Sequence, residues 1–325
     1  MLRPRLKQHA CALMLLVLCA CSAPPPMPAG GWEFAVIGDT PYSAGEEALL
    51  RPMLQTMNGE KLAFVAHVGD IIEGRGNCSD AVFEQRKALF ATIRHPFLLL
   101  PGDNDWTDCH RAGFDPLDAL IRFRRIFASD DGAPGPGAIK PERQSASDPR
   151  YSEYSENLRW RVRDVVFVGL NVPGSNNNLG RTAQMDAEYA RRMEANFEWL
   201  DQAVKKAERP DVSALVVMLQ ANPDFEGTWK RPPGVPDGFA SLRKVLVTHA
   251  RWLKKPLLLV HGDTHAFRVD RPLNDPDTGQ PLANFLRLEV DGSPRVGWAR
   301  INVNPATPGL FSIRREHAQG PSTPN

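Results

Sequence analysis

The sequence lacks an excess of charge of either sign, because 39 Lys and Arg residues stand against 38 Asp and Glu residues over 325 positions. Such a balance gives no general reason to expect binding to nucleic acid or to an anionic membrane surface. The sequence also has no internal repeat, and its longest apolar run is too short for a permanent membrane-spanning helix. Its hydrophobic fraction of 42% is ordinary for a globular protein. The length allows one large α/β domain or two ordinary ones.

The first residues are predicted to be a leader that is not part of the fold. Three basic residues precede an apolar segment over residues 10–20, and the run Leu18-Cys19-Ala20-Cys21-Ser22 resembles a bacterial lipobox with Cys21 as the lipidated residue. We therefore expect a lipoprotein signal peptide over residues 1–21 and a Pro- and Ala-rich tether over residues 22–31. An ordinary signal peptide is the alternative. Ser22 favours export to the periplasmic face of the outer membrane, with a lipid anchor.

Cysteine is scarce outside this leader, where only Cys78 and Cys109 remain. Each follows a Gly-Asp pair by a few residues, so both are expected near the same edge of a sheet. In an oxidising compartment two such cysteines form a disulfide. The alternative is that they bind a soft metal ion, which the surrounding carboxylates and histidines disfavour.

Four apolar runs in the sequence end in a Gly-Asp pair, and the chain has no other Gly-Asp pair. A short apolar run bounded by glycine is typical of a strand that is buried on both faces. Open α/β sheets place their ligands at the carboxyl ends of such strands. The pattern therefore predicts that four carboxylates converge on one site: Asp39, Asp70, Asp103 and Asp263.

The order of the predicted elements indicates an α/β fold. Strands and helices alternate from residue 33 to residue 127, which predicts a parallel sheet with right-handed crossovers. A loop over residues 129–149 leads to a meander of three short strands at 151–155, 158–163 and 165–170, and a long helix covers residues 183–208. Later strands are expected to form a closing antiparallel set. We expect one domain over residues 32–313, made of two mixed sheets flanked by helices, and a flexible tail over residues 314–325.

Polar residues flank the four aspartates, namely His67, Asn104, Asp105, His261 and His265. A set of carboxylates, imidazoles and an amide at strand ends suits one or two Zn, Mn or Fe ions better than Ca. The alternative for each Gly-Asp pair taken singly is a turn or a helix cap. His67 lies inside an apolar strand, so it is expected to support the site from behind and not to bind a metal ion.

The order of these blocks resembles the calcineurin-like metallophosphoesterases, and the chain is identified as a divergent bacterial lipoprotein member of that family. The resemblance covers residues 32–303 and implies a four-layer double-sheet sandwich with a two-metal centre. It implies that Asp39 is a ligand of one ion and that Asp70 bridges two. Across all blocks, the implied metal ligands are Asp39, Asp70, Asp103, Asn104, Gln220, Asp263, His265 and His261.

The chain departs from the family pattern at several of these positions. Pro41 stands where the first block usually has a histidine, and the neighbouring Tyr42 is expected in a supporting position. Asn104 stands where the family has its histidine acid, and Gln220 replaces the histidine of the fourth block. Since Asn104 cannot donate a proton as an acid, His110 becomes the candidate general acid. Asp105 is the other candidate catalytic residue.

The resemblance implies an exported phosphoesterase that hydrolyses a small phosphate mono- or diester with a metal-activated hydroxide. The rival interpretation is a surface lipoprotein that uses a degenerate phosphoesterase scaffold for binding, because the replacements at Pro41, Asp103 and Gln220 weaken the ligand set. An intracellular nuclease is disfavoured by the leader and by the balanced charge. The sequence gives no indication of the oligomeric state.

Overall fold

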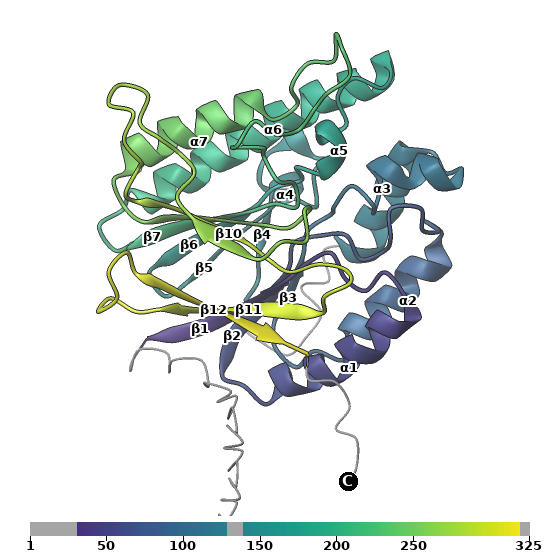
Figure 1. The fold of residues 1–325 in the computed structure, drawn as a ribbon, viewed down its shortest axis with the longest axis horizontal. Helices are drawn as coiled ribbons and strands as arrows, with labels where there is room; N and C mark the ends of the chain where they lie inside the picture. The colour runs from purple at the N-terminus through teal and green to yellow at the C-terminus, as the bar shows by residue number, and fades with distance from the viewer. Residues whose placement is uncertain (1–30, 129–138, 319–325) are drawn as a thin grey trace, which may run out of the picture.

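The computed structural model describes residues 31–128 and 139–318, arranged as two β-sheets with helices outside them (Figure 1). The expected signal peptide, most of the tether and the lipidation site Cys21 lie outside the described residues. None of the helices in the described ranges is long and apolar enough to cross a membrane.

The first sheet has five strands in the order β12-β11-β1-β2-β3. The strands are β1 (Trp32–Ile37), β2 (Leu62–His67), β3 (Phe97–Leu99), β11 (Gly297–Val303) and β12 (Phe311–His317). β1, β2 and β3 are parallel, whereas β11 runs antiparallel to β1 and β12. The crossovers contain α1 (Ala44–Asn58) and α2 (Asp80–Phe90), and β3 is followed by the short helix η1 (Thr107–Ala112) and by α3 (Pro116–Phe127). The predicted β-α-β-α-β alternation is confirmed.

The second sheet has seven strands in the order β4-β5-β6-β7-β8-β10-β9. The strands are β4 (Glu142–Arg143), β5 (Leu158–Val162), β6 (Val165–Gly169), β7 (Ala214–Met218), β8 (Leu257–His261), β9 (Arg268–Asp270) and β10 (Phe285–Glu289). The long helices that cover this sheet are α6 (Ala183–Ala207) and α7 (Ala240–Leu253). The shorter helices are α4 (Gln144–Ser147), η2 (Pro149–Tyr151) and α5 (Gly174–Asn177).

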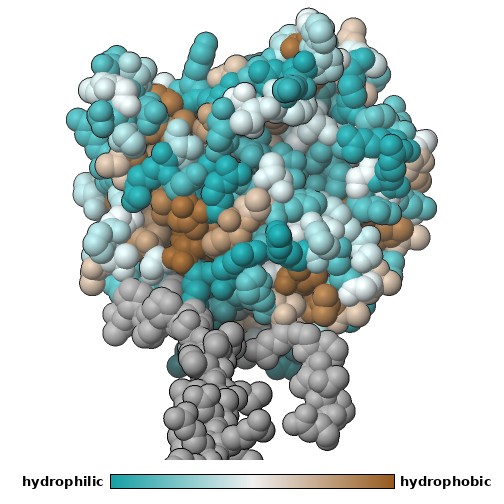
Figure 2. Space-filling model, in the orientation of Figure 1, coloured by the Kyte–Doolittle hydropathy of each residue, from teal (hydrophilic) through white to brown (hydrophobic). Residues whose placement is uncertain are grey.

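Three apolar cores bind these layers together. One core lies between the two sheets and contains residues such as Phe34 of β1 and Phe167 of β6. A second lies between the first sheet and α1, α2 and α3, and the third between the second sheet and α6 and α7. The result is the expected four-layer α/β sandwich. Because the apolar side chains are buried in these cores, the face in Figure 2 is mainly hydrophilic, with small separate hydrophobic areas.

Some expected details of the fold are wrong. β10 pairs parallel with β8, so the last strands do not form a purely antiparallel set; only β9, at the sheet edge, runs antiparallel to β10. The strand expected at residues 151–155 is instead the end of η2 and a turn, because Tyr151 and Tyr154 pack against Ala195 of α6. β4 and α4 fall within the expected loop at 129–149. β12 pairs with β11 as far as His317, so the tail does not begin at residue 314.

Candidate functional site

The aspartates of the four Gly-Asp pairs converge at the carboxyl ends of β1, β2, β3 and β8, between the two sheets. In the first sheet Ile37 pairs with His67 and His67 pairs with Leu99, so β1, β2 and β3 end at the same level. Asp263 follows β8 in the second sheet, and its backbone N–H donates to Asp39 Oδ1 at 3.0 Å. The cluster therefore joins the two sheets where they face each other.

The glycine before each aspartate leaves space for a close approach. A Cβ atom on Gly102 would lie 2.0 Å from Asp70 Oδ1, and one on Gly262 would lie 1.9 Å from Asp39 Oδ2. Neither glycine has a positive φ, so a side chain is excluded here by the neighbouring carboxylate and not by the backbone angle.

The sharp turn after several strands is made by a site residue itself. Asp39 has φ 51°, Asp70 has φ 61°, Asp263 has φ 84° and His265 has φ 59°. Asp and His tolerate left-handed backbone better than most residues with a Cβ atom, but it still costs energy, and a group of such residues at one place is typical of functional sites.

The carboxylates raise one another's pKa. Burial, and then the charge of Asp263, raises the pKa of Asp39 well above its ordinary value. Burial and the charges of Asp103 and Asp39 also raise the pKa of Asp70 well above its ordinary value. Burial and the charge of Asp103 raise the pKa of Asp263 to about 8. Within the described ranges no Lys or Arg forms an ion pair with any of these four carboxylates, whereas His265 Nε2 lies 3.6 Å from Asp39 Oδ1. Buried negative charge without a cation is costly, so the cluster is suited to a bound positive ion.

His265 presents one ring nitrogen to this cluster. Its Nδ1 lies 2.6 Å from the carbonyl oxygen of Ser293, which requires that Nδ1 carries the proton and donates it. Nε2 then has a free lone pair and lies 3.6 Å from Asp39 Oδ1. A metal-binding histidine is oriented in this way by a carbonyl behind it.

The Tyr42 hydroxyl lies among the candidate ligands. It donates to Asp70 Oδ2 at 3.1 Å, accepts from Asn104 Nδ2 at 3.0 Å and lies 3.4 Å from His265 Nε2. Burial and the charge of Asp70 raise the pKa of Tyr42. The phenol is therefore protonated and acts as a hydrogen-bond donor to Asp70.

Gln220 is buried beside Asp70, but its oxygen is directed elsewhere. Oε1 accepts from the backbone N–H of Gly174 at 2.6 Å, so Nε2 is the atom that reaches Asp70 Oδ2, at 3.1 Å. An amide nitrogen is a donor only and cannot bind a metal ion. The expectation that Gln220 is a ligand does not agree with this orientation. Asn104 also directs Nδ2 toward Tyr42 and the carbonyl of Ile72, at 3.0 Å each.

Asp105 and His67 support the site from behind. Asp105 accepts from the backbone N–H groups of Asp70, Ile71 and Gly102 at 2.8–2.9 Å, so its carboxylate fixes two strand-end turns. The role of Asp105 in this geometry is structural, which corrects its assignment as a catalytic residue. His67 Nε2 lies 2.9 Å from the carbonyl of Thr40, and its Nδ1 accepts from Gly69 N–H at 3.1 Å, so it ties the first turn to the second.

Two other histidines lie apart from the aspartates. His261 is buried, bonds to the carbonyl of Gly262 and has a pKa lowered to about 3, by burial and in part by the charge of Arg287. Strand alternation explains this placement, because His261 shares a face with Leu259, which packs toward α6 and α7. The expected ligand role of His261 is therefore wrong. His110 is exposed on η1, and its Nδ1 lies 2.9 Å from the carbonyl of Thr107 and 2.6 Å from Arg181 Nη1.

The disulfide between Cys78 and Cys109 is present, as expected. Both cysteines are buried, and the bond joins η1 to the segment that precedes α2. η1 is therefore held against the loop that follows Asp70.

A second polar group beside the cluster was not predicted. Ser175 Oγ donates to either Asp103 Oδ2 at 2.8 Å or Asp108 Oδ2 at 2.7 Å, and Arg111 Nη1 lies 2.7 Å from Asp108 Oδ2. Burial and the charge of Asp103 raise the pKa of Asp108 to about 7. Residues 175–178 all have positive φ. The run of three asparagines in this segment is the one sequence signal for it, because Asn tolerates left-handed backbone better than most residues.

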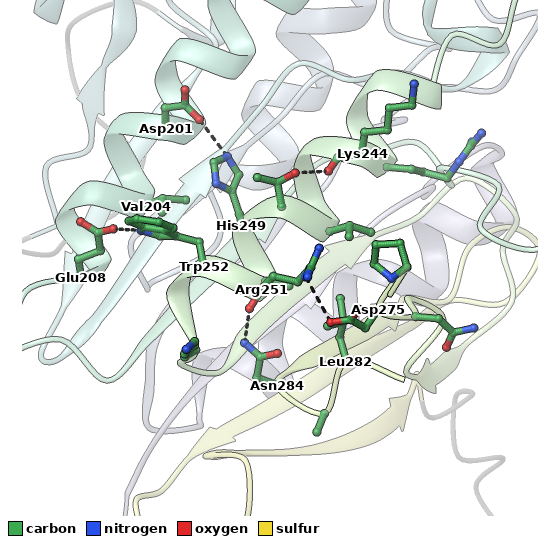
Figure 3. A pocket seen from close by; sticks show the side chains of 18 of the residues that line it. Asp201, Val204, Glu208, Lys244, His249, Arg251, Trp252, Asp275, Leu282 and Asn284 are labelled. Atoms are coloured by element: carbon green, nitrogen blue, oxygen red, sulfur yellow. Dashed lines mark hydrogen bonds and ion pairs between the residues drawn. The ribbon is translucent and has the colours of Figure 1, made fainter. Parts of the chain in front are cut away.

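A surface pocket lies away from this site, over α6 and α7 (Figure 3). Figure 3 shows His249 directed toward Asp201, Trp252 toward Glu208 and Arg251 toward Asp275. None of the candidate ligands lines this pocket. These three pairs satisfy several of its polar groups, and nothing in its lining indicates catalysis.

The donor set fits a metal ion in part. Among the described residues, no group of three or more His, Cys, Asp or Glu is already spaced to enclose an ion. Asp70 and His265 nevertheless both contact the Tyr42 hydroxyl, at 3.1 Å and 3.4 Å, and Asp39 lies 3.6 Å from His265 Nε2. An ion that prefers oxygen and imidazole ligands suits these three donors. A Cβ atom on Gly174 would lie 2.7 Å from Asp263 Oδ1 and 2.9 Å from Asp103 Oδ1. These two carboxylates therefore both approach Gly174.

No family model and no curated protein matches this sequence. Solved structures do match. A dimetal phosphatase from Danio rerio is 13% identical with a TM-score of 0.57, and the match covers 89% of this chain and 96% of that one. PhoD is 13% identical with a TM-score of 0.52, over 86% of this chain and 66% of that one.

The purple acid phosphatase PPD1 from yellow lupin (Lupinus luteus) is 12% identical with a TM-score of 0.53, and the match covers 91% of this chain and 53% of that one. This chain thus spans almost the whole of the first structure, but only about half to two thirds of the other two. At such low identity the likeness concerns the fold alone. The chain has the calcineurin-like metallophosphoesterase fold.

Proposed function

We propose that this protein is an exported, metal-dependent phosphoesterase. The observation that carries the proposal is the set of four carboxylates between the two strand edges, of which Asp39, Asp70 and Asp103 are buried and Asp263 is half-buried, with no Lys or Arg paired to them in the described part of the chain. Nε2 of His265, the nitrogen not bonded to Ser293, faces the same set and lies 3.6 Å from Asp39 Oδ1. A fold shared with a dimetal phosphatase supports the same conclusion.

Asp39, Asp70 and His265 would hold one divalent ion. Asp103 and Asp263, with Asp70 shared, would supply the donors for a second. This second set contains carboxylates only. Gln220 cannot join it, because the atom that Gln220 directs toward Asp70 is its amide nitrogen. Carboxylates suit harder ions, so Mn²⁺ fits the whole set better than Zn²⁺ or Fe²⁺.

Divalent ions bound here would lower the pKa of a water molecule and neutralise charge on a phosphoryl group. The chain itself contributes orientation and exclusion of water. Asn104 N–H and Gln220 Nε2 donate to the two oxygens of Asp70, at 2.9 Å and 3.1 Å, so that its carboxylate is fixed in one plane. His110 is the proposed source of the proton for the leaving group, since Asn104 cannot act as an acid.

The proposed export depends on the leader, which lies outside the described residues. The disulfide supports it, because such bonds form and persist in oxidising compartments. A lipid anchor at Cys21 on the periplasmic face of the outer membrane is part of the same proposal.

A second candidate function is binding on a degenerate phosphoesterase scaffold. The orientation of Gln220 favours it, because one expected ligand is replaced by a hydrogen-bond donor.

One experiment distinguishes the two functions. The purified protein is assayed with 4-nitrophenyl phosphate and bis(4-nitrophenyl) phosphate in the presence of Mn²⁺, Zn²⁺, Fe²⁺ or Ca²⁺. Hydrolysis that is lost with a chelator and restored with Mn²⁺ supports the esterase. Absence of hydrolysis with every ion, together with absence of bound metal, supports the binding function.

A further inference from the structure

An acidic cluster repels an anionic ester unless positive charge lies close by. Asp39, Asp70, Asp103 and Asp108 are buried here, and Asp263 is half-buried beside them. Among the described residues, the arginines whose ion pairs reach this group are Arg111 and Arg181, both through Asp108.

These two arginines differ in how their donors are used. Arg181 Nη1 donates to the carbonyl of Thr107 at 2.5 Å, and its Nη2 donates to Asn178 Oδ1 at 2.5 Å. Arg181 therefore braces η1 against the left-handed segment at residues 175–178. Its two terminal nitrogens are therefore used within the protein, and its Nε is buried and so is not offered to a substrate.

Arg111 has that capacity. Its side chain is 39% exposed, and its strong contact is the one from Nη1 to Asp108 at 2.7 Å. The contacts with Gly74 O at 3.5 Å and Ser175 Oγ at 3.4 Å are long. A guanidinium has five N–H donors in a planar fork, so several remain for the oxygens of a phosphate.

The position of Arg111 places it next to the cluster. A Cβ atom on Gly74 would lie 2.9 Å from Asn104 Oδ1 and 3.2 Å from Arg111 Nη1, so these two side chains approach the same glycine. Asn104 in turn donates its backbone N–H to Asp70 Oδ1 at 2.9 Å. On the other side, Ser175 Oγ is within hydrogen-bond distance of both Asp108 and Asp103.

The frame that holds Arg111 is rigid. The disulfide at Cys109 fixes η1, which carries Arg111. The left-handed segment that carries Ser175 is held by the buried Arg192, which donates to Asn177 Oδ1 at 2.6 Å and to the carbonyl of Asn177 at 3.0 Å. These contacts fix the backbone that carries Arg111, and the Asp108 pair orients its half-exposed guanidinium.

We propose that Arg111 binds the terminal oxygens of the phosphate group and makes phosphate monoesters the preferred substrate class. A monoester dianion has three terminal oxygens and one more negative charge than a diester, which has two such oxygens. A forked cation at the mouth of the site therefore favours the monoester. This inference rests on the proposed esterase function.

The test compares Arg111→Ala and Arg111→Lys with the unchanged protein and with Arg251→Ala. Arg251 is a matched control, because it is 41% exposed, pairs with carboxylates and lies in the distant pocket over α7. For each protein, kcat/KM is measured with 4-nitrophenyl phosphate and with bis(4-nitrophenyl) phosphate in Mn²⁺. Binding of inorganic phosphate is measured by titration calorimetry in the same buffer, and thermal unfolding verifies the fold.

We expect Arg111→Ala to lower kcat/KM for the monoester by about tenfold to hundredfold and to weaken phosphate binding by a similar factor, with a much smaller loss on the diester. Arg111→Lys keeps the charge but not the planar guanidinium, so its kcat/KM for the monoester and its phosphate affinity should lie between those of Arg111→Ala and of the unchanged protein. Arg251→Ala should match the unchanged protein in both. If Arg111→Ala does not fold, Arg111→Lys decides: a reduced monoester preference supports the proposal, and an unchanged preference overturns it.

Equal losses on the two esters, or unchanged phosphate binding in Arg111→Ala, would overturn the monoester proposal and leave the esterase function intact. Absence of hydrolysis in the unchanged protein would instead reject the esterase function. In that case phosphate binding decides for Arg111: weaker binding in Arg111→Ala supports the anion contact, and unchanged binding overturns it.

Discussion

Gln220 holds Asp70 by a hydrogen bond from Nε2 to Oδ2 of 3.1 Å, while its own oxygen accepts from Gly174 N–H at 2.6 Å. The orientation of the amide is set by the backbone donor, because only an oxygen can accept there. Gln220 therefore orients Asp70 and does not bind a metal ion itself. This one contact distinguishes the present site from one in which a histidine stands at the same strand end.

Gln220→His is expected to increase the affinity for a second divalent ion, since an imidazole nitrogen is a stronger ligand than any group Gln220 offers there. Binding of Mn²⁺ and Zn²⁺ is measured by titration, with the number of ions per chain as the readout. Gln220→Ala is the control, because it removes the hydrogen bond to Asp70 and adds no ligand. The prediction fails if the two variants bind the second ion equally weakly.

Tyr42→Phe is expected to leave the number of bound ions unchanged. Burial and the charge of Asp70 raise the pKa of Tyr42, so the phenol stays protonated and is not an anionic ligand. Loss of its hydrogen bond to Asp70 should cost about 1 kcal/mol of folding free energy in the metal-free protein. Metal content and urea unfolding are the measurements. A variant that loses an ion would show that Tyr42 binds the metal.

His110→Ala is expected to spare the bound metal and to lower kcat, by roughly 10²–10⁴-fold if His110 is the general acid. His110 lies on η1, and none of its recorded contacts is with the four aspartates, so its removal should not disturb them. The decrease should be largest for an ester with a poor leaving group and small for 4-nitrophenyl phosphate, whose leaving group needs no proton. Full activity on both kinds of ester would exclude His110 from the reaction.

The metal-free protein is expected to lose stability as the pH rises from about 6.5 to about 8. Burial raises the pKa of Asp105 to about 7 and, with the charge of Asp103, that of Asp263 to about 8. Each folded-state pKa lies above the unfolded value, so the stabilisation is present at low pH and is lost as the pH rises through the folded pKa.

Histidines partly offset this loss near the lower end of the window, because an unfolded histidine, with an ordinary pKa of about 6.5, still binds protons there that the folded histidine does not. The pKa values of His67 and His261 are lowered to about 4 and about 3 by burial, so both stay neutral in the folded protein above pH 6.5. The slope should be roughly 1 kcal/mol per pH unit for each carboxyl group. Chemical unfolding at several pH values between about 6.5 and 8 measures the slope of folding free energy against pH. Added Mn²⁺, or the substitution Asp263→Asn, should reduce that slope. If the folding free energy of the chelator-treated protein did not change with pH, the raised pKa values of these carboxyl groups would be contradicted.

The positions of Asp39, Asp70 and Asp263 could be predicted from the sequence because each follows an apolar strand, and parallel strands end at a common edge. The same alternation could have excluded His261, which shares the helix-facing side of β8 with Leu259. The orientation of Gln220 could not be predicted, since it depends on the backbone of Gly174, 46 residues away. The role of Ser175 could not be predicted either, because its left-handed segment is fixed by tertiary contacts such as those of Arg192.

Quantification of bound metal in the unchanged protein and in Asp70→Asn tests whether the acidic cluster holds metal ions through Asp70. Asp70 is the carboxylate that both donor sets share, and substitution by Asn removes its charge at nearly constant volume. We predict at least one divalent ion per chain in the unchanged protein, and loss of both metal and phosphoesterase activity in Asp70→Asn, which remains folded. A folded Asp70→Asn variant that keeps its metal and its activity would contradict the account.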